Sequence, residues 1–330
     1  SRTMSSNAPT ISKWLKSPAR LIFVHGKRLV RFSYWPVAVQ PIEDILKLAK
    51  HAESTGWDGV WVADHFMPNA ENVDSPVHEG WSLVTALATQ VPRIRVGPLV
   101  LGNTYRHPTL TANMAVTVDH ISGGRLVLGL GAGWQANEHE KYGLPFYTVG
   151  ERLRRLDEAC TIIRSLWSEK RTNLDGRYYQ LTDAPCEPKP GPEGIPLLIG
   201  GGGEKVTLKI VAKHADEWNV WSTVETMKRK SAILDQHCEA VGRDPAEIQR
   251  CSVALVYLSD DASEVQRRRT EAQPRETIAG NVSQMQDILG EYQAAGVDEF
   301  IFPEFNLPLG ATAEKLDLMD RFIEEVAKGF

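Results

Sequence analysis

Three short segments of the sequence carry residue types that could do chemistry, and each directly follows an apolar run. The first is Asp64-His65, which comes after Gly59–Ala63. A histidine changes charge near neutral pH, so it can donate a proton to a reacting group or accept one from it. A lone histidine is more often a structural group, but a place at the end of a strand favours catalysis. We expect His65 to be a proton donor or an orienting group.

The other two segments are glycine-rich turns, Gly131–Trp134 and Gly200–Gly203. Glycines that open a helix leave backbone N–H groups free, and the helix dipole favours an anion there. Gly200–Gly203 therefore predicts a phosphate site, with a tight strand-to-helix turn as the alternative. In Gly131–Trp134, the small residues would let a ligand approach the backbone.

Apolar runs and helical periods alternate along the chain and must position these segments. The expected strands are Val30–Tyr34, Gly59–Ala63, Ile94–Leu101, Leu126–Leu130, Leu197–Ile199, Trp218–Trp221, Ser252–Leu258 and Phe300–Phe302. Eight strand-helix units predict an α/β fold, a (β/α)8 TIM barrel, as a single domain over residues 29–330. A doubly wound open sheet is the alternative. Residues 1–28 are basic and broken by proline and glycine, and we interpret them as an N-terminal extension.

Function in a TIM barrel lies at the C-terminal ends of the strands. That rule adds Trp35, Trp221 and Glu304 as walls of a substrate pocket. It also selects the third strand, where Gly97-Pro98 predicts a bulge because proline cannot donate to a sheet ladder. A helix is expected to follow, because its apolar positions fall at helical spacing, namely Leu110, Met114, Val118 and Ile121.

A long insertion, Ser168–Ile195, separates the fourth helix from the fifth strand. It carries four prolines and has no helical period, and loops of this length are usually functional. We expect it to cover the mouth of the pocket as a lid and to bring Tyr178 to the substrate.

The composition excludes several classes of function. The chain has 330 residues, 42% hydrophobic and 24% charged, with a net charge of −5, which argues against binding nucleic acid or an acidic membrane. Its longest apolar runs fall short of a membrane span. The four cysteines form no C-x-x-C pair and the histidines show no ligand spacing, so no metal site is expected. We expect a cytoplasmic homodimer that acts on a small molecule.

Four segments together resemble a known family. They are GWDGVWVADHF (56–66), DHISGGRLVLGLGAGWQANEHEKYG (119–143), PLLIGGGGEKVTLKIVAKHADEWNVW (196–221) and AGVDEFIFPEF (295–305). In their residues and in their order along the chain, they resemble the bacterial-luciferase-like superfamily of flavin- and deazaflavin-dependent oxidoreductases. The similarity covers roughly residues 29–330 and is closest to the branch that uses coenzyme F420.

The resemblance implies roles for particular residues. It places the cofactor phosphate on Gly200–Gly203, and a nonprolyl cis peptide near Pro98-Leu99 behind the cofactor ring. It places His65 near the carbon that exchanges hydride. Trp134 stands where sugar-phosphate dehydrogenases of the superfamily carry a carboxylate, so that acid is absent. The residues expected to bind the cofactor are Asp64, Pro98, Leu99, Gly131, Ala132, Gly133, Trp134, Asn137, His139, Gly201, Gly202 and Gly203.

The resemblance favours an oxidoreductase that moves a hydride between F420 and an organic substrate whose identity stays open. The alternative is an FMN-dependent monooxygenase on the same barrel, since both cofactors need the same phosphate turn and ring bulge. A noncatalytic flavin-binding protein would not need His65, the bulge and the glycine turn together. An unrelated metal-dependent hydrolase would need ligand spacing that the sequence does not show.

Overall fold

The computed structural model describes residues 23–24 and 27–330. The expected N-terminal extension, residues 1–28, therefore lies largely outside the described residues. Within it, β1 (Phe23–Val24) and β2 (Lys27–Arg28) form a small antiparallel pair.

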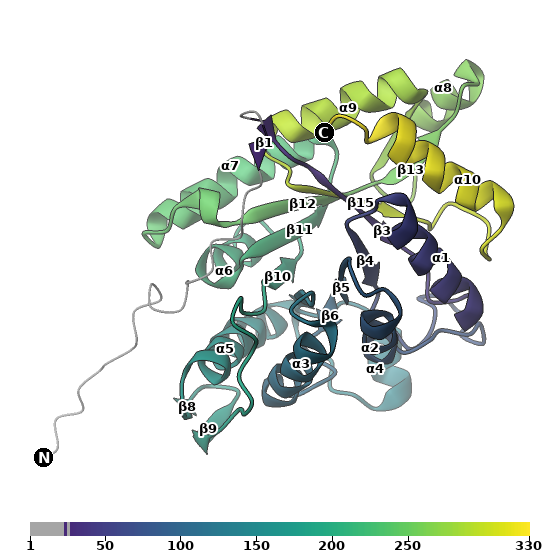
Figure 1. The fold of residues 1–330 in the computed structure, drawn as a ribbon. Helices are drawn as coiled ribbons and strands as arrows, with labels where there is room; N and C mark the ends of the chain where they lie inside the picture. Colours follow the sequence, from purple (N-terminus) through teal and green to yellow (C-terminus); the bar gives the residue numbers. More distant parts are fainter. Residues whose placement is uncertain (1–22, 25–26) are drawn as a thin grey trace, which may run out of the picture.

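Nine parallel strand segments form a nearly closed barrel at the centre of the molecule (Figure 1). In spatial order they are β5 (Arg95–Pro98), β4 (Gly59–Val62), β3 (Arg31–Trp35), β15 (Glu299–Pro303), β12 (Gln249–Val253), β11 (Glu217–Trp221), β10 (Leu197–Gly200), β7 (Leu128–Gly131) and β6 (Leu101–Gly102). β5 and β6 are two halves of one interrupted crossing, because β5 pairs with β4 and β6 pairs with β7. The eight crossings confirm the (β/α)8 expectation.

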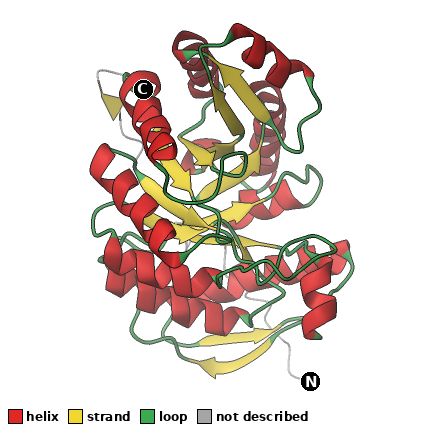
Figure 2. Cartoon of the chain, turned by 90° about the vertical axis from the view of Figure 1, so that its right-hand side faces the viewer, coloured by secondary structure: helices red, strands yellow, loops and turns green. Residues whose placement is uncertain are grey.

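The helices lie outside the strands (Figure 2). They are α1 (Ile42–Thr55), α2 (Gly80–Gln90), α3 (Pro108–Ser122), α4 (Ala136–Tyr142), α5 (Val149–Ser168), α6 (Thr207–His214), α7 (Val224–Ala240), α8 (Ala262–Thr270), α9 (Val282–Ala294) and α10 (Ala313–Arg321), which continues into a π turn at Phe322–Val326. A short 3₁₀ turn spans Pro245–Glu247. No helix among the described residues is both long and apolar enough to cross a bilayer.

The apolar positions that predicted α3 do not all turn inward: Val118 is buried and Met114 packs against the core, whereas Leu110 and Ile121 face outward. Leu110 is 53% exposed and Ile121 is 45% exposed. The helix instead buries small and branched residues, among them Ala112, Ala115 and Val116. Small side chains allow close approach to α2 and α5, and this contact decides which of two apolar faces turns inward.

Two insertions interrupt the barrel pattern. The expected one, Ser168–Ile195, contains the antiparallel pair β8 (Thr172–Asp175) and β9 (Gln180–Ala184). The second was not expected, because Ser252–Leu258 looked like one strand. The chain leaves the barrel at Ala254, and β13 (Leu255–Leu258) pairs only with β14 (Thr277–Gly280), with α8 between them.

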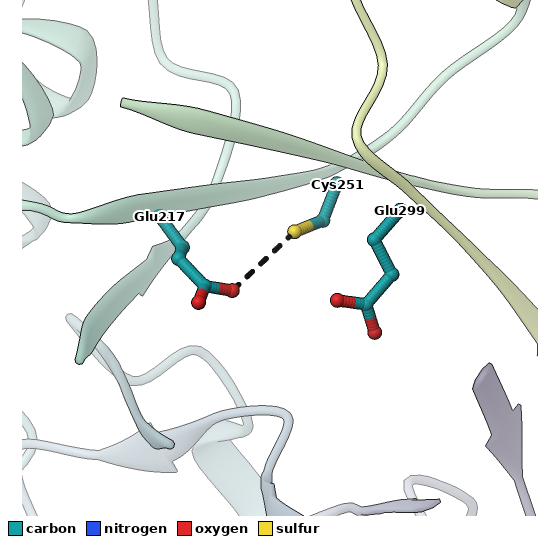
Figure 3. Close-up of side chains that lie close together, drawn as sticks. All are labelled: Glu217, Cys251 and Glu299. Carbon is teal, nitrogen blue, oxygen red and sulfur yellow. Dashed lines mark hydrogen bonds between the residues drawn. The ribbon is translucent and has the colours of Figure 1, made fainter. Parts of the chain in front are cut away.

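A charged layer closes the N-terminal end of the barrel interior. Glu217 begins β11 and Glu299 begins β15, the two strands that flank β12, and Cys251 on β12 lies between them (Figure 3). Arg95 Nη1 lies 2.6 Å from Glu299, its Nη2 pairs with Glu217, and Arg31 Nη2 lies 3.3 Å from Glu299. Two cations thus balance two anions, and burial raises the pKa of the Cys251 thiol, so the group has no net charge to attract a metal. This charged layer is neutral overall and lies beneath an apolar interior that includes Trp61, Val127 and Leu198.

Candidate active site

A cavity of about 830 Å³ opens at the C-terminal ends of the barrel strands. Most of the residues expected to bind the cofactor or substrate lie on its wall, although they come from six separate parts of the chain. These are Trp35, Asp64, His65, Leu99, Gly131, Ala132, Gly133, Trp134, Gly201, Gly203 and Trp221. The lining is mainly apolar, as is usual for sites that bind cofactors and small substrates.

His65 is held by a buried carboxylate that the sequence did not point to. Its Nδ1 lies 3.1 Å from Oε2 of Glu138, on α4. Glu138 also accepts hydrogen bonds from the Tyr105 hydroxyl and from the backbone N–H groups of Phe66 and Met67. Burial raises the pKa of Glu138, but these hydrogen bonds and the nearby His65 outweigh it and lower the pKa below its usual value.

The ionised carboxylate determines which ring nitrogen of His65 can react. A carboxylate can only accept, so Nδ1 carries the proton that it shares with Glu138. Nε2 is then the ring atom left for a substrate. In the neutral ring Nε2 can accept a proton, and in the protonated ring it can donate one. The Trp134 ring stands edge-on to His65, with centroids 5.4 Å apart, and is 52% exposed. Trp134 therefore forms one wall of the cavity beside this nitrogen.

The neighbours of Glu138 on α4 fix the helix in place. His139 Nδ1 lies 2.8 Å from the Gln135 carbonyl and its Nε2 lies 2.7 Å from Thr104 Oγ1. Asn137 donates to the Pro68 carbonyl at 2.9 Å. Neither side chain reaches the cavity wall, so the expectation that Asn137 and His139 contact the cofactor is not met in this structure. Their bonds tie α4 to two loops and so hold Glu138 against His65.

Asp64 anchors the loop that follows β6. Its two oxygens lie 2.8 and 2.9 Å from Arg106, and one also accepts from the Gly102 N–H at 3.0 Å. Arg106 in turn contacts Glu79 at 2.7 Å. Asp64 still lines the cavity, but its charge is already neutralised by this bidentate pair.

The interrupted third strand forms an apolar part of the cavity wall. Its nonprolyl cis peptide joins Leu99 to Val100, one bond beyond the expected Pro98-Leu99 position, and Pro98 itself does not line the cavity. Glycines on the neighbouring strands make room for Val100. A Cβ on Gly131 would lie 2.8 Å from a Val100 methyl group, and one on Gly200 would lie 2.9 Å away. The resulting smooth surface suits a flat ring.

The second glycine turn presents free donors to the same cavity. Gly201 donates to the Asn219 carbonyl at 3.0 Å. The N–H groups of Gly202 and Gly203 have no acceptor among residues 23–24 and 27–330. Thr207, the first residue of α6, also lines the cavity, and a Cβ on Gly203 would lie 2.7 Å from its hydroxyl. Gly202 itself is turned away, with its carbonyl accepting from Lys230.

Three aromatic rings, those of Trp35, Trp221 and Phe305, form another part of the cavity wall. The centroids of Trp35 and Phe305 are 4.7 Å apart, and those of Trp221 and Phe305 are 5.9 Å apart. This arrangement supports the pocket roles of Trp35 and Trp221 and adds Phe305, which the sequence reasoning missed. An aromatic residue directly after Glu304 was the available signal.

Two residues expected in the substrate pocket lie elsewhere. Glu304 is buried in a network with Lys315 Nζ at 3.0 Å, the Tyr34 hydroxyl at 2.5 Å and the Val37 N–H at 2.8 Å. Tyr178 packs on the outside of α5, where its hydroxyl accepts from Arg154 at 2.8 Å. No residue of Ser168–Ile195 lines the cavity, so the expected lid does not cover it in this structure.

Comparisons with known proteins agree with this geometry. The model of the family described as "Luciferase-like monooxygenase" matches residues 25–298. An F420-dependent glucose-6-phosphate dehydrogenase of Kineococcus radiotolerans is 32% identical over 67% of this chain and 66% of its own. A 5,10-methylenetetrahydromethanopterin reductase of Archaeoglobus fulgidus is 37% identical over 51% of this chain and 46% of its own. The chain thus spans about half to two thirds of the curated relatives it matches.

Solved structures share the fold at low sequence identity. An F420-dependent secondary alcohol dehydrogenase in complex with an F420-acetone adduct superposes with a TM-score of 0.77 at 20% identity, covering 90% of this chain and 98% of that one. The long-chain alkane monooxygenase LadA gives a TM-score of 0.73 at 16% identity, covering 91% of each chain. The same barrel therefore serves both kinds of oxidoreductase.

Proposed function

The chain belongs to the luciferase-like monooxygenase family, and on that premise we propose that it is an F420-dependent oxidoreductase that transfers a hydride to or from a small organic substrate. The observation that carries the proposal is His65, whose Nε2 is left free at the cavity while Glu138 holds Nδ1. The relatives named as F420-dependent dehydrogenases support the choice of cofactor.

The residues around the cavity fit a deazaflavin. A volume of about 830 Å³ is in the range of cofactor sites. Leu99 and Val100 offer a flat apolar surface to the ring, and the N–H group of Gly203 with the hydroxyl of Thr207 offers donors to a phosphate. When bound, F420 supplies or takes up a hydride, a two-electron step.

His65 supplies the proton that balances this step. When a carbonyl carbon gains the hydride, the carbon-oxygen π electrons move onto oxygen. That oxygen takes the proton from Nε2 of the doubly protonated His65 ring, which leaves the neutral ring with its proton on Nδ1. In the reverse direction, Nε2 takes the alcohol proton as the carbon loses its hydride. Such acid-base help is typically worth about 10²–10⁴-fold in rate. Trp134 excludes water beside the reacting atoms.

The aromatic wall favours an apolar substrate over a sugar phosphate. Trp35, Trp221 and Phe305 offer wide ring faces and few hydrogen-bond partners for a row of hydroxyl groups. Trp134 takes the place of the carboxylate that sugar-phosphate dehydrogenases of the superfamily carry. We therefore assign to this chain an alcohol or carbonyl compound with an apolar body, which is a different substrate class from that in the relatives' names.

An FMN-dependent monooxygenase is the second candidate, favoured by the shared fold of LadA. Fluorescence-quenching titration of the purified protein with F420 and with FMN separates the two. The proposal requires clearly tighter binding of F420. His65→Asn should then bind F420 normally but lose turnover in a screen of alcohols and ketones. Tight FMN binding alone would support the monooxygenase, and binding of neither would overturn both.

The proposed active form is a homodimer. Leu110 and Ile121 lie on the outward face of α3 and are 53% and 45% exposed. A second copy of this chain would cover them. Light scattering should give twice the chain mass for the parent and a monomer for the Leu110→Glu, Ile121→Glu double variant. A monomeric parent would contradict this proposal.

A further inference from the structure

A buried arginine at the cavity wall has no counter-ion among the described residues. Arg152, in the first turn of α5, is 8% exposed and lines the cavity. Its Nη1 donates to the Tyr147 carbonyl, and its guanidinium lies 4.0 Å from the centroid of the Phe146 ring. Its Nε is buried without a partner, and no carboxylate of the described residues lies within ion-pair distance. A buried charge is costly unless it is paired.

The carboxylate that lines the same cavity is already paired with another arginine. Asp64, which also lines it, is bound by Arg106 through both oxygens. The other arginine of the wall, Arg275, is exposed and lies 5.2 Å from the Trp221 ring centroid, on the aromatic side. Of the two arginines of the wall, Arg152 is therefore the buried one.

Arg152 and the second glycine turn belong to the same sector of the barrel. α5 leads into β10, and Gly200–Gly203 follows β10 directly. Leu156, one turn beyond Arg152 on α5, lines the cavity together with Gly201 and Gly203. Residues from the N-terminal turns of α5 and α6, Arg152 and Thr207, thus line the same cavity.

We infer that Arg152 is the counter-ion of the cofactor's phosphate group, with Gly203 and Thr207 as the neutral donors of the same site. The inference rests on the proposed function and adds to it a binding residue outside the glycine turn. An arginine held at one nitrogen still has the remaining N–H groups of its planar fork for phosphate oxygens. Phosphate binding would also pair the buried charge of the guanidinium.

The test compares ligands with and without the phosphate. Affinities of F420 and of the same deazaflavin ending in a free ribityl hydroxyl are measured by fluorescence quenching for the parent and for Arg152→Met. The variant should lose about 10- to 100-fold in affinity for F420, as expected for a charge-assisted contact. Its affinity for the phosphate-free ligand should change by no more than about twofold, because the ring surface is untouched.

Two matched variants serve as controls. Arg154→Met removes the same charge from the same helix, but Arg154 contacts Tyr178 outside the cavity, so F420 affinity should persist. Arg275→Met removes the other unpaired cation of the wall. A selective loss of F420 affinity in Arg275→Met instead of Arg152→Met would place the phosphate on the aromatic side and overturn the assignment.

Three further outcomes would each contradict either the assignment of Arg152 or the proposed function. Equal losses for both ligands in Arg152→Met would show a structural role only. If that variant does not fold, Arg152→Lys and the salt dependence of the parent replace it: F420 binding, but not phosphate-free binding, must weaken as salt rises. Salt-independent F420 binding would overturn the assignment while leaving the proposed function intact. Binding of neither ligand by the parent would instead overturn the proposed function.

Discussion

His65 Nδ1 lies 3.1 Å from Oε2 of Glu138, and that carboxylate is fully buried. The two residues come from different strand-to-helix connections, 73 positions apart in sequence. The contact fixes the proton on Nδ1 and directs Nε2 to the cavity. A second group oriented behind a histidine is a recurring arrangement in enzymes that transfer protons.

Glu138→Gln should lower turnover more than it lowers cofactor affinity. The amide can still contact His65, but it carries no charge to stabilise a protonated ring, and its NH₂ group can force the other tautomer. We expect turnover to fall by about 10²-fold, within the range of acid-base effects, with F420 affinity unchanged within a few-fold. Steady-state kinetics and quenching titrations measure the two. A parallel loss of affinity would mean that Glu138 acts only by holding the loop at Phe66.

Gly203→Ala should weaken cofactor binding by steric crowding alone. The added Cβ would lie 2.7 Å from Thr207 Oγ1 and displace that hydroxyl from the proposed phosphate site. We expect about a tenfold loss in F420 affinity, the equivalent of one lost hydrogen bond. Gly150→Ala, whose Cβ would meet only a side chain of Arg154 at 3.3 Å, is the control. Equal F420 affinities of the two variants would contradict the assignment of the phosphate site to this turn.

Arg95→Met should destabilise the barrel without touching the cavity. Arg95 pairs with both Glu217 and Glu299, and its loss leaves Glu217 as a buried charge without a cationic partner. Breaking one side of a buried ion pair typically costs about 3–5 kcal/mol. Urea unfolding should show this loss, whereas Arg93→Met, whose side chain is 69% exposed, should be nearly neutral. A small effect at Arg95 would show that water reaches the charged layer.

His214 should make stability fall on mild acidification. Burial lowers the pKa of His214, and this outweighs the opposing hydrogen bond to Asp157. The unfolded chain therefore binds the proton more readily, so stability rises with pH and is lost as the pH drops below about 6.5. His214→Gln should show a smaller fall in urea midpoint between pH 7.5 and pH 5.5. An identical fall in parent and variant would assign the effect to other groups.

The periodicity of the chain was enough to predict the barrel, because alternating buried strands and amphipathic helices have few stable arrangements. It also placed His65 and the glycine turns at the functional end, since a residue that follows a parallel strand has only one rim on which to lie. These are local properties, and they survive any detail of packing.

Contacts between distant segments decided the rest. Whether Glu138, Asn137 or His139 faces His65 depends on how α4 docks against two loops, and a seven-residue helix carries no periodic signal strong enough to fix that rotation. The inward face of α3 and the break at Ala254 likewise depend on partners far along the chain. The isolation of Arg152 is the clearest case. Whether Arg152 has a counter-ion depends on where every acidic side chain of the chain lies after folding. Only the tertiary structure could therefore reveal that it has none among the described residues.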